Sequence, residues 1–314
     1  MILILGAGGF LGFSFASHLS NVGLHFRTLS RTFQWDELPG EHRFRCDVFS
    51  CDHATTLLDQ VTTIVYMAGS TDLARAEVDS ASDLAEHVFQ MDSFFAFMRS
   101  VGKCDFRFLF VSSSGTVYGD SNGSSSVESD RLSPKSAYGR RNVFLEELFS
   151  TSVRLLGAQS LILRVSNPFG PSQYRFRRKG LVQSLIHSSL TQQPMQLRGM
   201  GKQVRDYIHV DDLVSVILKL ASFDRWPFGV LNVASGYSFS ANEIVEILRG
   251  AGFSPVVNLS SESSAFDVDC SQVDNSRLCS ALNIDHQLLY PFTDSKLTSL
   301  SLGLNSLDSS DLKP

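Results

Sequence analysis

The sequence predicts an α/β protein in which a doubly wound parallel sheet is followed by a smaller, discontinuous C-terminal lobe. Short apolar runs alternate with longer amphipathic stretches over the first half of the chain, as is typical of β-α-β units. The chain opens on an apolar run, Met1–Leu5, and a glycine follows it directly. After about residue 166 the pattern loosens into a turn-rich passage with Pro168, Gly170 and Pro171. With 314 residues, 43% of them hydrophobic, the chain can bury a large core.

The spacing of apolar residues places the first helix at Gly9–Ser20. Two longer amphipathic stretches, Ser82–Val101 and Tyr138–Leu156, are predicted to be helices that cover the sheet. The Ser- and Gly-rich segment Asp120–Ser136 is predicted to be a surface loop. Further strands are expected at His25–Leu29, Arg43–Cys46, Thr63–Tyr66, Phe106–Val111 and Ser160–Arg164, and later at Asp206–His209 and Val230–Val233, with a helix at Val210–Ala221.

A glycine-rich loop joins the first strand to the first helix. Gly6, Gly9 and Gly12 are spaced three residues apart, and Phe10 and Leu11 lie within the same turn. Glycines in this strand–turn–helix context let the backbone approach a pyrophosphate, which then binds at the helix N-terminus. The loop therefore predicts a dinucleotide site and a Rossmann-type fold.

The end of the second strand bears on the choice of coenzyme. An acidic residue at this position would bind the adenosine ribose hydroxyls of NAD. The chain instead has Ser30 and Arg31, and Arg31 could pair with the 2′-phosphate of NADP. We therefore expect NADP or NAD, with NADP favoured; the alternative is that Arg31 is only a solvated loop charge.

The domain boundaries follow from these elements. Residues 1–165 are predicted to form the Rossmann domain, to which 201–234 return. Residues 166–200 and 235–295 are predicted to form the smaller lobe. Residues 296–314 are expected to be a partly disordered tail, because they are rich in Ser and Leu without a clear period.

Composition excludes several classes of function. The net charge of −5 and the pI of about 5.9 argue against a nucleic-acid binder. The five cysteines have no metal-site spacing, so neither a metal nor a disulfide framework is expected. The apolar run at the N-terminus is too short for a signal peptide or a membrane span. We expect a cytoplasmic protein without membrane contact.

Four further segments have a recognisable order and spacing. They are Phe110–Asp120 (FVSSSGTVYGD), Ser136–Asn142 (SAYGRRN) followed by Glu146, Leu163–Pro171 (LRVSNPFGP) and Val204–Asp212 (VRDYIHVDD). Together with the glycine loop, they resemble the signatures of the extended short-chain dehydrogenase/reductases. The resemblance is to the NAD(P)-dependent epimerase/dehydratase family, which includes UDP-glucose 4-epimerase, and it extends to about residue 285.

The resemblance implies catalytic roles for three residues. Tyr138 matches the general acid/base, and Ser114, with Thr116 as a second choice, matches the hydroxyl that hydrogen-bonds the reacting sugar oxygen. The family's lysine four residues after the tyrosine is Asn142 here. A cation about 5 Å from the phenol favours the phenolate by roughly 3 kcal/mol at an effective dielectric constant near 20. Tyr138 is therefore expected to be a poorer base unless Arg141 supplies the charge.

The resemblance also implies binding roles. Asn167 and Arg205 would contact the diphosphate of a nucleotide sugar, whereas Asp206 and Asp212 are expected to be structural. Relatives commonly have an arginine just before the position of Asp267, but this chain does not. The coenzyme would also contact Asp47, Val48, Met67, Ala68, Gly69, Tyr138 and Asn142.

These implications predict a nucleotide-sugar epimerase in carbohydrate biosynthesis, with hydride transfer at the sugar C4. Dehydration is disfavoured, because it usually needs an Asp-Glu pair where this chain has Gly115-Thr116. An NADPH-dependent keto-sugar reductase is one alternative. A weakly catalytic, coenzyme-binding regulatory or structural protein is another, on account of Asn142. A homodimer is expected, since the two long helices have more large apolar residues than one buried face requires.

Overall fold

The computed structural model describes residues 1–31, 43–45, 54–69, 73–102, 105–121, 123–175 and 180–305. The chain divides into two compact units, and each is built from segments that are not contiguous in the sequence. The first unit comprises Met1–Ser113, Ser136–Arg164 and Val216–Leu231, and the second comprises Ser114–Lys135, Val165–Ser215 and Asn232–Pro314.

The predicted doubly wound sheet is confirmed. Its seven strands have the order β10-β6-β5-β4-β1-β2-β3, and the pairs β1–β2, β1–β4, β2–β3 and β4–β5 are parallel. The chain moves from β1 outward to β3 and then returns to β4 on the other side of β1, so the topological switch lies at β1 and β4. The strands are β1 (Ile2–Leu5), β2 (Phe26–Ser30), β3 (Arg43–Arg45), β4 (Thr63–Tyr66), β5 (Arg107–Ser113), β6 (Gln159–Val165) and β10 (Val230–Val233).

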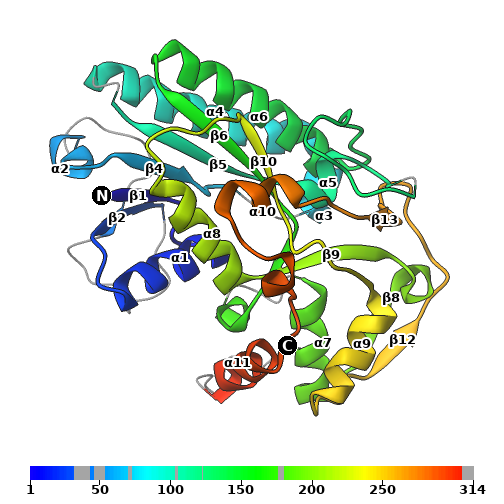
Figure 1. Ribbon diagram of the computed structural model, residues 1–314. Coiled ribbons are helices and arrows are strands. Elements are labelled where there is room, and N and C mark those ends of the chain that lie inside the picture. Colours follow the sequence, from blue (N-terminus) through cyan, green and yellow to red (C-terminus); the bar gives the residue numbers. More distant parts are fainter. Residues whose placement is uncertain are drawn as a thin grey trace. The chain divides into compact units, whose positions relative to one another are not determined.

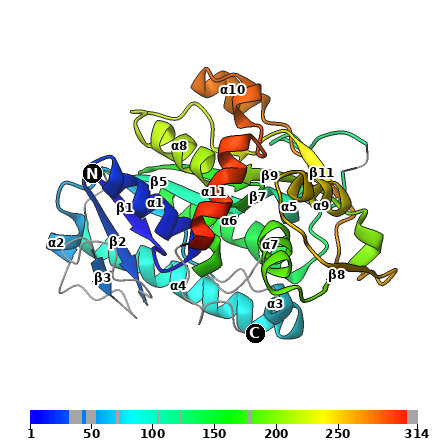
Figure 2. The ribbon, with the colours of Figure 1, turned by 90° about the horizontal axis from the view of Figure 1, so that it is seen from below.

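Helices cover both faces of this sheet. The long helices α4 (Ser80–Val101) and α6 (Ala137–Leu155) lie side by side on one face, and α1 (Phe10–Asn21) lies on the other (Figures 1 and 2). Because both faces are covered, the central strands β1 (ILIL) and β4 (TIVY) are largely apolar along their whole length rather than alternating. Two short helices, α2 (Ala54–Leu58) and α3 (Leu73–Val78), complete the described helices that lie wholly within this unit.

Aromatic side chains fill the layer between the sheet and helices α4 and α6. Phe94 and Phe95 of α4 meet Phe108 of β5 with ring centroids 6.4 and 5.9 Å apart. Phe149 of α6 stacks on Phe110 at 5.0 Å. These rings are all at most 3% exposed, so the phenylalanines that the sequence places on the two long helices are mostly core residues.

The second unit contains two smaller sheets. One has the order β11-β9-β13, with β7 also paired to β9, and the other pairs β12 with β8. Helices α7 (Leu181–Thr191) and α9 (Ala241–Gly250) pack together, with Ile186 and Ile244 fully buried in their shared core. The remaining elements are α5 (Ser114–Val117), β7 (Asn167–Phe169), η3 (Pro171–Arg175), β8 (Met195–Leu197), η4 (Arg198–Gly201), β9 (Val204–His209), β11 (Ser238–Ser240), β12 (Val257–Leu259), β13 (Cys270–Ser271), α10 (Ser276–Leu282), η5 (His286–Leu289) and α11 (Asp294–Asn305).

The segment 201–234 does not return to the main sheet as a block. Only β10 joins that sheet, whereas β9 finds its hydrogen-bonding partners in β7, β11 and β13. Helix α8 (Val210–Ala221) is divided, with its residues up to Ser215 assigned to the second unit. The sequence pattern identified both strands correctly but could not identify their neighbours.

The segment Asp120–Ser136 is more than a surface loop. The Asp120 carboxylate accepts a hydrogen bond from the backbone N–H of Asp269 at 2.6 Å. The backbone N–H of Ser126 donates to Gln272 at 2.9 Å, and Ser126 is buried. These contacts attach the loop to the second unit through polar groups, which leave no hydrophobic period in the sequence.

The predicted tail contains helix α11, which continues to Asn305. Leu300 is fully buried in the core of the second unit. The ammonium of Lys296 lies 2.5 Å from the Asp212 carboxylate, and both side chains are largely buried. This anchoring orders residues 296–305, and the rest of the tail lies outside the described residues.

A buried ion pair fixes α6 to the sheet. Arg164 of β6 donates through Nε and Nη2 to the carboxylate of Glu146 on α6, at 3.1 and 2.8 Å to Oε2. The Ser112 hydroxyl donates to the other carboxylate oxygen at 2.5 Å. Both ionic side chains are 6% exposed, so each charge depends on its partner.

We expect Glu146→Ala to destabilise the protein by about 3–5 kcal/mol, because it leaves the Arg164 guanidinium buried without a counter-charge. Chemical denaturation measures the free energy of unfolding. The matched control is Glu147→Ala, one residue along, where the carboxylate is exposed and meets only Thr151 among the described residues; a loss below about 0.5 kcal/mol is expected there. Equal losses for the two variants would contradict this interpretation of the ion pair.

Candidate active site

The glycine loop ends β1 at the topological switch of the sheet. Gly6 has φ +96°, and a Cβ atom built on it would lie 2.7 Å from the backbone nitrogen of Ala68. A Cβ atom on Gly12 would lie 2.4 Å from the Gly6 carbonyl oxygen. These two glycines are therefore required by the packing of the loop itself.

Gly9 differs from the other two glycines. A Cβ atom on Gly9 would have no described protein atom nearer than 3.6 Å, so internal packing does not require a glycine there. Gly9 is the N-cap of α1, so no side chain caps the helix. Phe10 and Leu11 follow it, and the first turn has no acidic residue. The site therefore has free space at a helix N-terminus, where backbone N–H groups and the helix dipole favour a phosphate. These residues fit a dinucleotide pyrophosphate.

Ser30 ends β2 beside this loop, and Arg31 follows it. The backbone N–H of Gly8 donates to the Ser30 hydroxyl at 3.2 Å, so Ser30 helps to hold the loop. Arg31 lies 3.3 Å from the Glu86 carboxylate, which also pairs with Arg75 at 2.5 Å. Partial burial acts to raise the pKa of Glu86. Hydrogen bonds from Arg75 and Arg31 outweigh it and hold this pKa below its usual value. Two cations thus share one carboxylate at the end of β2.

The end of β4 completes the switch point. The backbone N–H of Met67 donates to Leu5 at 2.9 Å, and Ala68 lies against Gly6. Gly69 has φ +147°, and its missing side chain leaves room for the His87 ring. A Cβ atom at this position would lie 3.3 Å from that ring. Met67 and Ala68 thus lie against the start of the glycine loop, and Gly69 lies against His87. That these residues contact the coenzyme stays a prediction; Asp47 and Val48 lie outside the described residues.

Helix α6 carries Tyr138 in its first turn. Ser136 caps the helix by accepting from the Gly139 N–H at 3.0 Å, and Tyr138 follows two residues later. The guanidinium carbon of Arg141 lies over the Tyr138 ring, 4.6 Å from its centroid. Arg141 also donates to the buried carboxylate of Asp83 on α4 at 2.7 Å. Asn142, one turn after Tyr138, is buried.

The substrate-side residues belong to the second unit. Ser114 at the start of α5 is 0% exposed, and its hydroxyl has no hydrogen-bond partner among the described residues. A Cβ atom on the neighbouring Gly115 would lie 3.5 Å from the Asn167 amide. Asn167 itself donates to the backbone carbonyl of Asp206 at 2.7 Å. Because a buried hydroxyl without a partner is costly, Ser114 is suited to a ligand oxygen.

Arg205 lies on β9, and its guanidinium donates to the backbone carbonyls of Val204, at 2.8 Å, and Val268. Lys135 approaches the same segment: its ammonium donates to the Asp267 carbonyl at 3.2 Å and pairs with the Asp120 carboxylate. The hydrogen bond to Asp120 raises the pKa of Lys135. Sequence reasoning noted the arginine missing before Asp267 but did not identify Lys135, which is distant in sequence.

The structural roles expected for Asp206 and Asp212 are confirmed. Asp206 is fully buried and accepts from the backbone N–H groups of Ser235 and Gly236 at 3.1 and 2.7 Å. Burial raises the pKa of Asp206 to about 7, against the effect of these hydrogen bonds. Asp212 pairs with Lys296, as described above.

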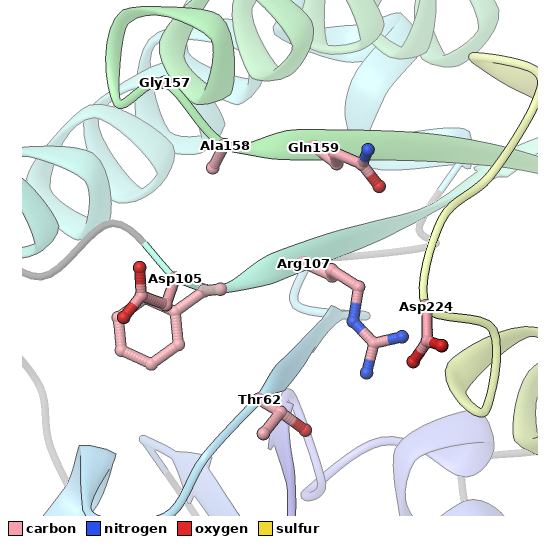
Figure 3. Close-up of a pocket in the computed structure, with 8 residues that line it drawn as sticks. Thr62, Asp105, Arg107, Gly157, Ala158, Gln159 and Asp224 are labelled. Atoms are coloured by element: carbon pink, nitrogen blue, oxygen red, sulfur yellow. The ribbon is translucent and has the colours of Figure 1, made fainter.

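A separate cavity of about 380 Å³ lies at the amino ends of β4, β5 and β6 (Figure 3). The Arg107 side chain extends from the start of β5 toward the loop that carries Asp224. Exposed carboxylates of Asp105 and Asp224 flank it. None of the predicted site residues lines this cavity, and ligands of doubly wound sheets bind at the opposite, carboxyl edge.

The part of the chain that the structure describes offers neither a metal site nor a membrane span. No group of His, Cys, Asp and Glu side chains there could hold a metal ion. Among the same residues, no helix is both long and apolar enough to cross a membrane.

Comparisons with known proteins agree with this geometry. A dTDP-4-dehydro-6-deoxyglucose reductase of Escherichia coli is 24% identical over 258 residues, which is 79% of this chain and 80% of the reductase. A putative UDP-glucose 4-epimerase of Methanocaldococcus jannaschii is 31% identical over 143 residues, or 46% of each chain.

Solved structures share the fold. MoeE5, solved in complex with UDP-glucose and NAD, has a TM-score of 0.82 and 24% identity, over 97% of this chain and 98% of that one. The UDP-glucose 4-epimerase of Thermus thermophilus, solved with NAD, has a TM-score of 0.81 and 20% identity, over 98% and 100% of the two chains. The model of the NAD dependent epimerase/dehydratase family matches residues 2–234. The chain therefore belongs to the NAD-dependent epimerase/dehydratase family.

Proposed function

We propose that the protein is a nucleotide-sugar 4-epimerase with Tyr138 as its acid/base. The observation that carries the proposal is the Ser114 hydroxyl, which is fully buried and has no protein partner among the described residues. Buried hydroxyls normally have a hydrogen-bond partner, and a substrate oxygen would supply the partner that Ser114 lacks.

The first unit would hold the coenzyme. The space above Gly9 and the N-terminus of α1 would take the pyrophosphate. Asn142 would hydrogen-bond the nicotinamide ribose in place of the family's lysine. When bound, the nicotinamide coenzyme would supply reversible hydride chemistry at the sugar C4.

The proton chemistry would fall to two side chains of the protein. The Tyr138 phenolate removes the proton of the C4 hydroxyl as the C4–H bond breaks, which leaves a 4-keto sugar and a neutral phenol. Ser114 donates a hydrogen bond to the same oxygen and so stabilises its developing charge. In the reverse direction Tyr138 would return its proton to the C4 oxygen, which would give the epimer if the opposite face of C4 is reduced.

Nucleotide recognition would use the cations of the second unit. We propose that Arg205 contacts the substrate diphosphate, with Asn167 beside it. Lys135 is the second cation, in place of the arginine that relatives have before the position of Asp267. Its ammonium and the Arg205 guanidinium both donate to carbonyls of the segment 267–268, and phosphate oxygens are good partners for such a pair.

A keto-sugar reductase is the second candidate. It is favoured by the likeness to the Escherichia coli reductase, which extends over 79% of the chain. The same Tyr138 and Ser114 would then protonate and polarise a ketone, with the coenzyme consumed. A dehydratase is disfavoured, since Gly115 and Thr116 provide no carboxylate for elimination.

The decisive experiment incubates the protein with a panel of UDP- and dTDP-sugars, with NAD and NADP each supplied, and follows the sugars by NMR. We expect interconversion of C4 epimers with no net change in coenzyme. Stoichiometric loss of NADPH with a 4-keto sugar would favour the reductase instead. Binding of coenzyme without any turnover would contradict the proposed activity and favour a regulatory or structural protein.

Variants test the roles of the residues. Tyr138→Phe is expected to lower kcat by about 10²–10⁴-fold, because the proton has no acceptor. Ser114→Ala should lower kcat by about 10²-fold through loss of one donor to the oxyanion. Lys135→Met should instead raise KM, because the diphosphate is remote from C4. Full activity of Tyr138→Phe would remove this residue from the mechanism.

We propose that NADP binds at least as well as NAD, since β2 ends in Ser30 and Arg31 without an acidic residue. A 2′-phosphate must compete with Glu86 for Arg31. Arg31→Ala should therefore weaken NADP by about 10–100-fold and leave NAD unchanged, and Glu86→Gln should strengthen NADP. Calorimetry measures both affinities, and a wild-type protein that binds NAD tenfold better than NADP would exclude this role of Arg31.

We also propose a homodimer formed through α4 and α6. Most large apolar residues of these helices are buried, but Phe89 is 67% exposed and Phe144 is 50% exposed. Burying these rings against a second copy would remove apolar area from water.

Light scattering at micromolar concentration should give the mass of a dimer, and Phe144→Glu should give a monomer, because it buries a charge in the interface. Leu24→Glu is the matched control: Leu24 is also 50% exposed but follows α1, so the dimer should persist. A monomeric wild-type protein would contradict the proposal.

A further inference from the structure

The contact between Arg141 and Tyr138 is part of a buried cluster. The Arg141 guanidinium carbon lies 4.6 Å from the centre of the Tyr138 ring. Arg141 and Asp83 are paired at 2.7 Å, and their side chains are only 4% and 2% exposed. The ring of His87 approaches the same carboxylate, with Nδ1 3.8 Å from Oδ1. A cation is therefore held against the face of the acid/base residue from a neighbouring helix.

The hydrogen bonding of this ion pair is incomplete. The Asp83 Oδ1 atom is buried and makes no hydrogen bond with any described residue. His87 bonds instead to the backbone carbonyl of Asp83 at 2.7 Å, and burial lowers its pKa, which keeps the ring neutral. A buried ion pair of this kind stabilises a fold little or not at all compared with apolar side chains of the same size. Its cost is a reason to look for a function.

We propose that Asp83 is a positioning residue that holds Arg141 on Tyr138, and that this pair replaces the lysine missing at position 142. The proposal rests on the acid/base role of Tyr138 given above. Arg141 follows Tyr138 by three residues and so shares its face of α6. The salt bridge to Asp83 keeps the guanidinium on this face.

The two charges act in opposite directions on Tyr138. The Arg141 cation favours the phenolate, and the Asp83 carboxylate, which pairs with this guanidinium, opposes it. Asn142 contributes no charge. The other titratable or charged groups on the helices packed around Tyr138 are Arg75 and Glu77 on α3, Glu86, His87, Asp92 and Arg99 on α4, and Arg140, Glu146, Glu147 and Arg154 on α6.

This arrangement predicts opposite effects for the two members of the pair. Arg141→Met removes the cation and should move the acidic limb of the kcat pH profile up by about one pH unit. Asp83→Asn keeps an acceptor for Arg141 but leaves the cation uncompensated, so the limb should move down by about one pH unit. Arg141→Lys retains the charge, so the acidic limb of its kcat pH profile should lie between those of Arg141→Met and the wild type.

Glu146→Gln is the control for a purely structural role. Glu146 is a similarly buried carboxylate paired with an arginine, but it lies in the middle of α6, eight residues after Tyr138, beside Arg164 of β6. The Glu146→Gln variant should have a lower melting temperature, with the acidic limb of its kcat pH profile unmoved. If Asp83→Asn behaves like Glu146→Gln, Asp83 is structural and the proposal is wrong.

A second measurement needs no turnover. Ultraviolet titration of the phenolate absorbance, with the Tyr138→Phe protein subtracted, isolates the ionisation of Tyr138. The same opposite shifts are expected for Arg141→Met and Asp83→Asn, and identical titrations of these two variants and the wild type would overturn the proposal. Because this readout is independent of any substrate, a protein that shows the shifts without epimerase activity would refute the proposed function alone.

Discussion

The close approach of Gly6 to Ala68 is the constraint on which the arrangement of the first unit depends. It brings the ends of β1 and β4 within backbone contact at the point where the strand order reverses. A side chain at Gly6 would push these strand ends apart, and the glycine loop and the 67–69 segment would no longer face one site. The positive φ of Gly6 adds a second reason, because few other residues accept that conformation. The coenzyme site is thus a consequence of sheet packing before any ligand is considered.

A second constraint orients helix α6. The Glu146–Arg164 pair joins the middle of α6 to β6, and the Ser136 cap fixes where the helix begins. Tyr138, Arg141 and Asn142 lie between these two points. Their directions therefore follow from a cap and an ion pair that take no part in chemistry, which explains why Arg164 and Glu146 accompany the signature residues in the sequence.

Much of the first unit could be predicted from the sequence, because its signals are local. The apolar runs gave strand positions within about two residues, and the glycine loop has the predicted strand–turn–helix context. Less of the second unit could be predicted from the sequence. Its strands β7, β8, β11, β12 and β13 have three residues or fewer, too short for a period-two pattern. Its polar attachments, such as Asp120 to Asp269, join residues far apart in the chain.

The candidate site shows the same division between local and distant information. Ser114, Tyr138 and Asn167 could be predicted because each lies inside a short motif. The structure shows that Ser114 is fully buried, and the roles of the three residues stay predictions. Asp83 and Lys135 were missed. An aspartate within an apolar helix, four residues before a histidine, is a weak signal that something polar is buried there. Nothing local links Asp83 to Arg141, which is 58 residues away.

Three of the four cations predicted to meet a ligand or Tyr138 already have a carboxylate partner, whereas Arg205 donates to backbone carbonyls. Arg31 pairs with Glu86, Arg141 with Asp83, and Lys135 with Asp120. A carboxylate lowers the field that a cation presents to a phosphate or a phenolate, and this costs binding energy. It also holds a flexible side chain in one place, so less conformational entropy is lost when the ligand binds. Such pairing suits a protein of net charge −5, in which unpaired carboxylates would otherwise repel a nucleotide: the positive groups are few, and their positions, more than their number, decide which anion is recognised.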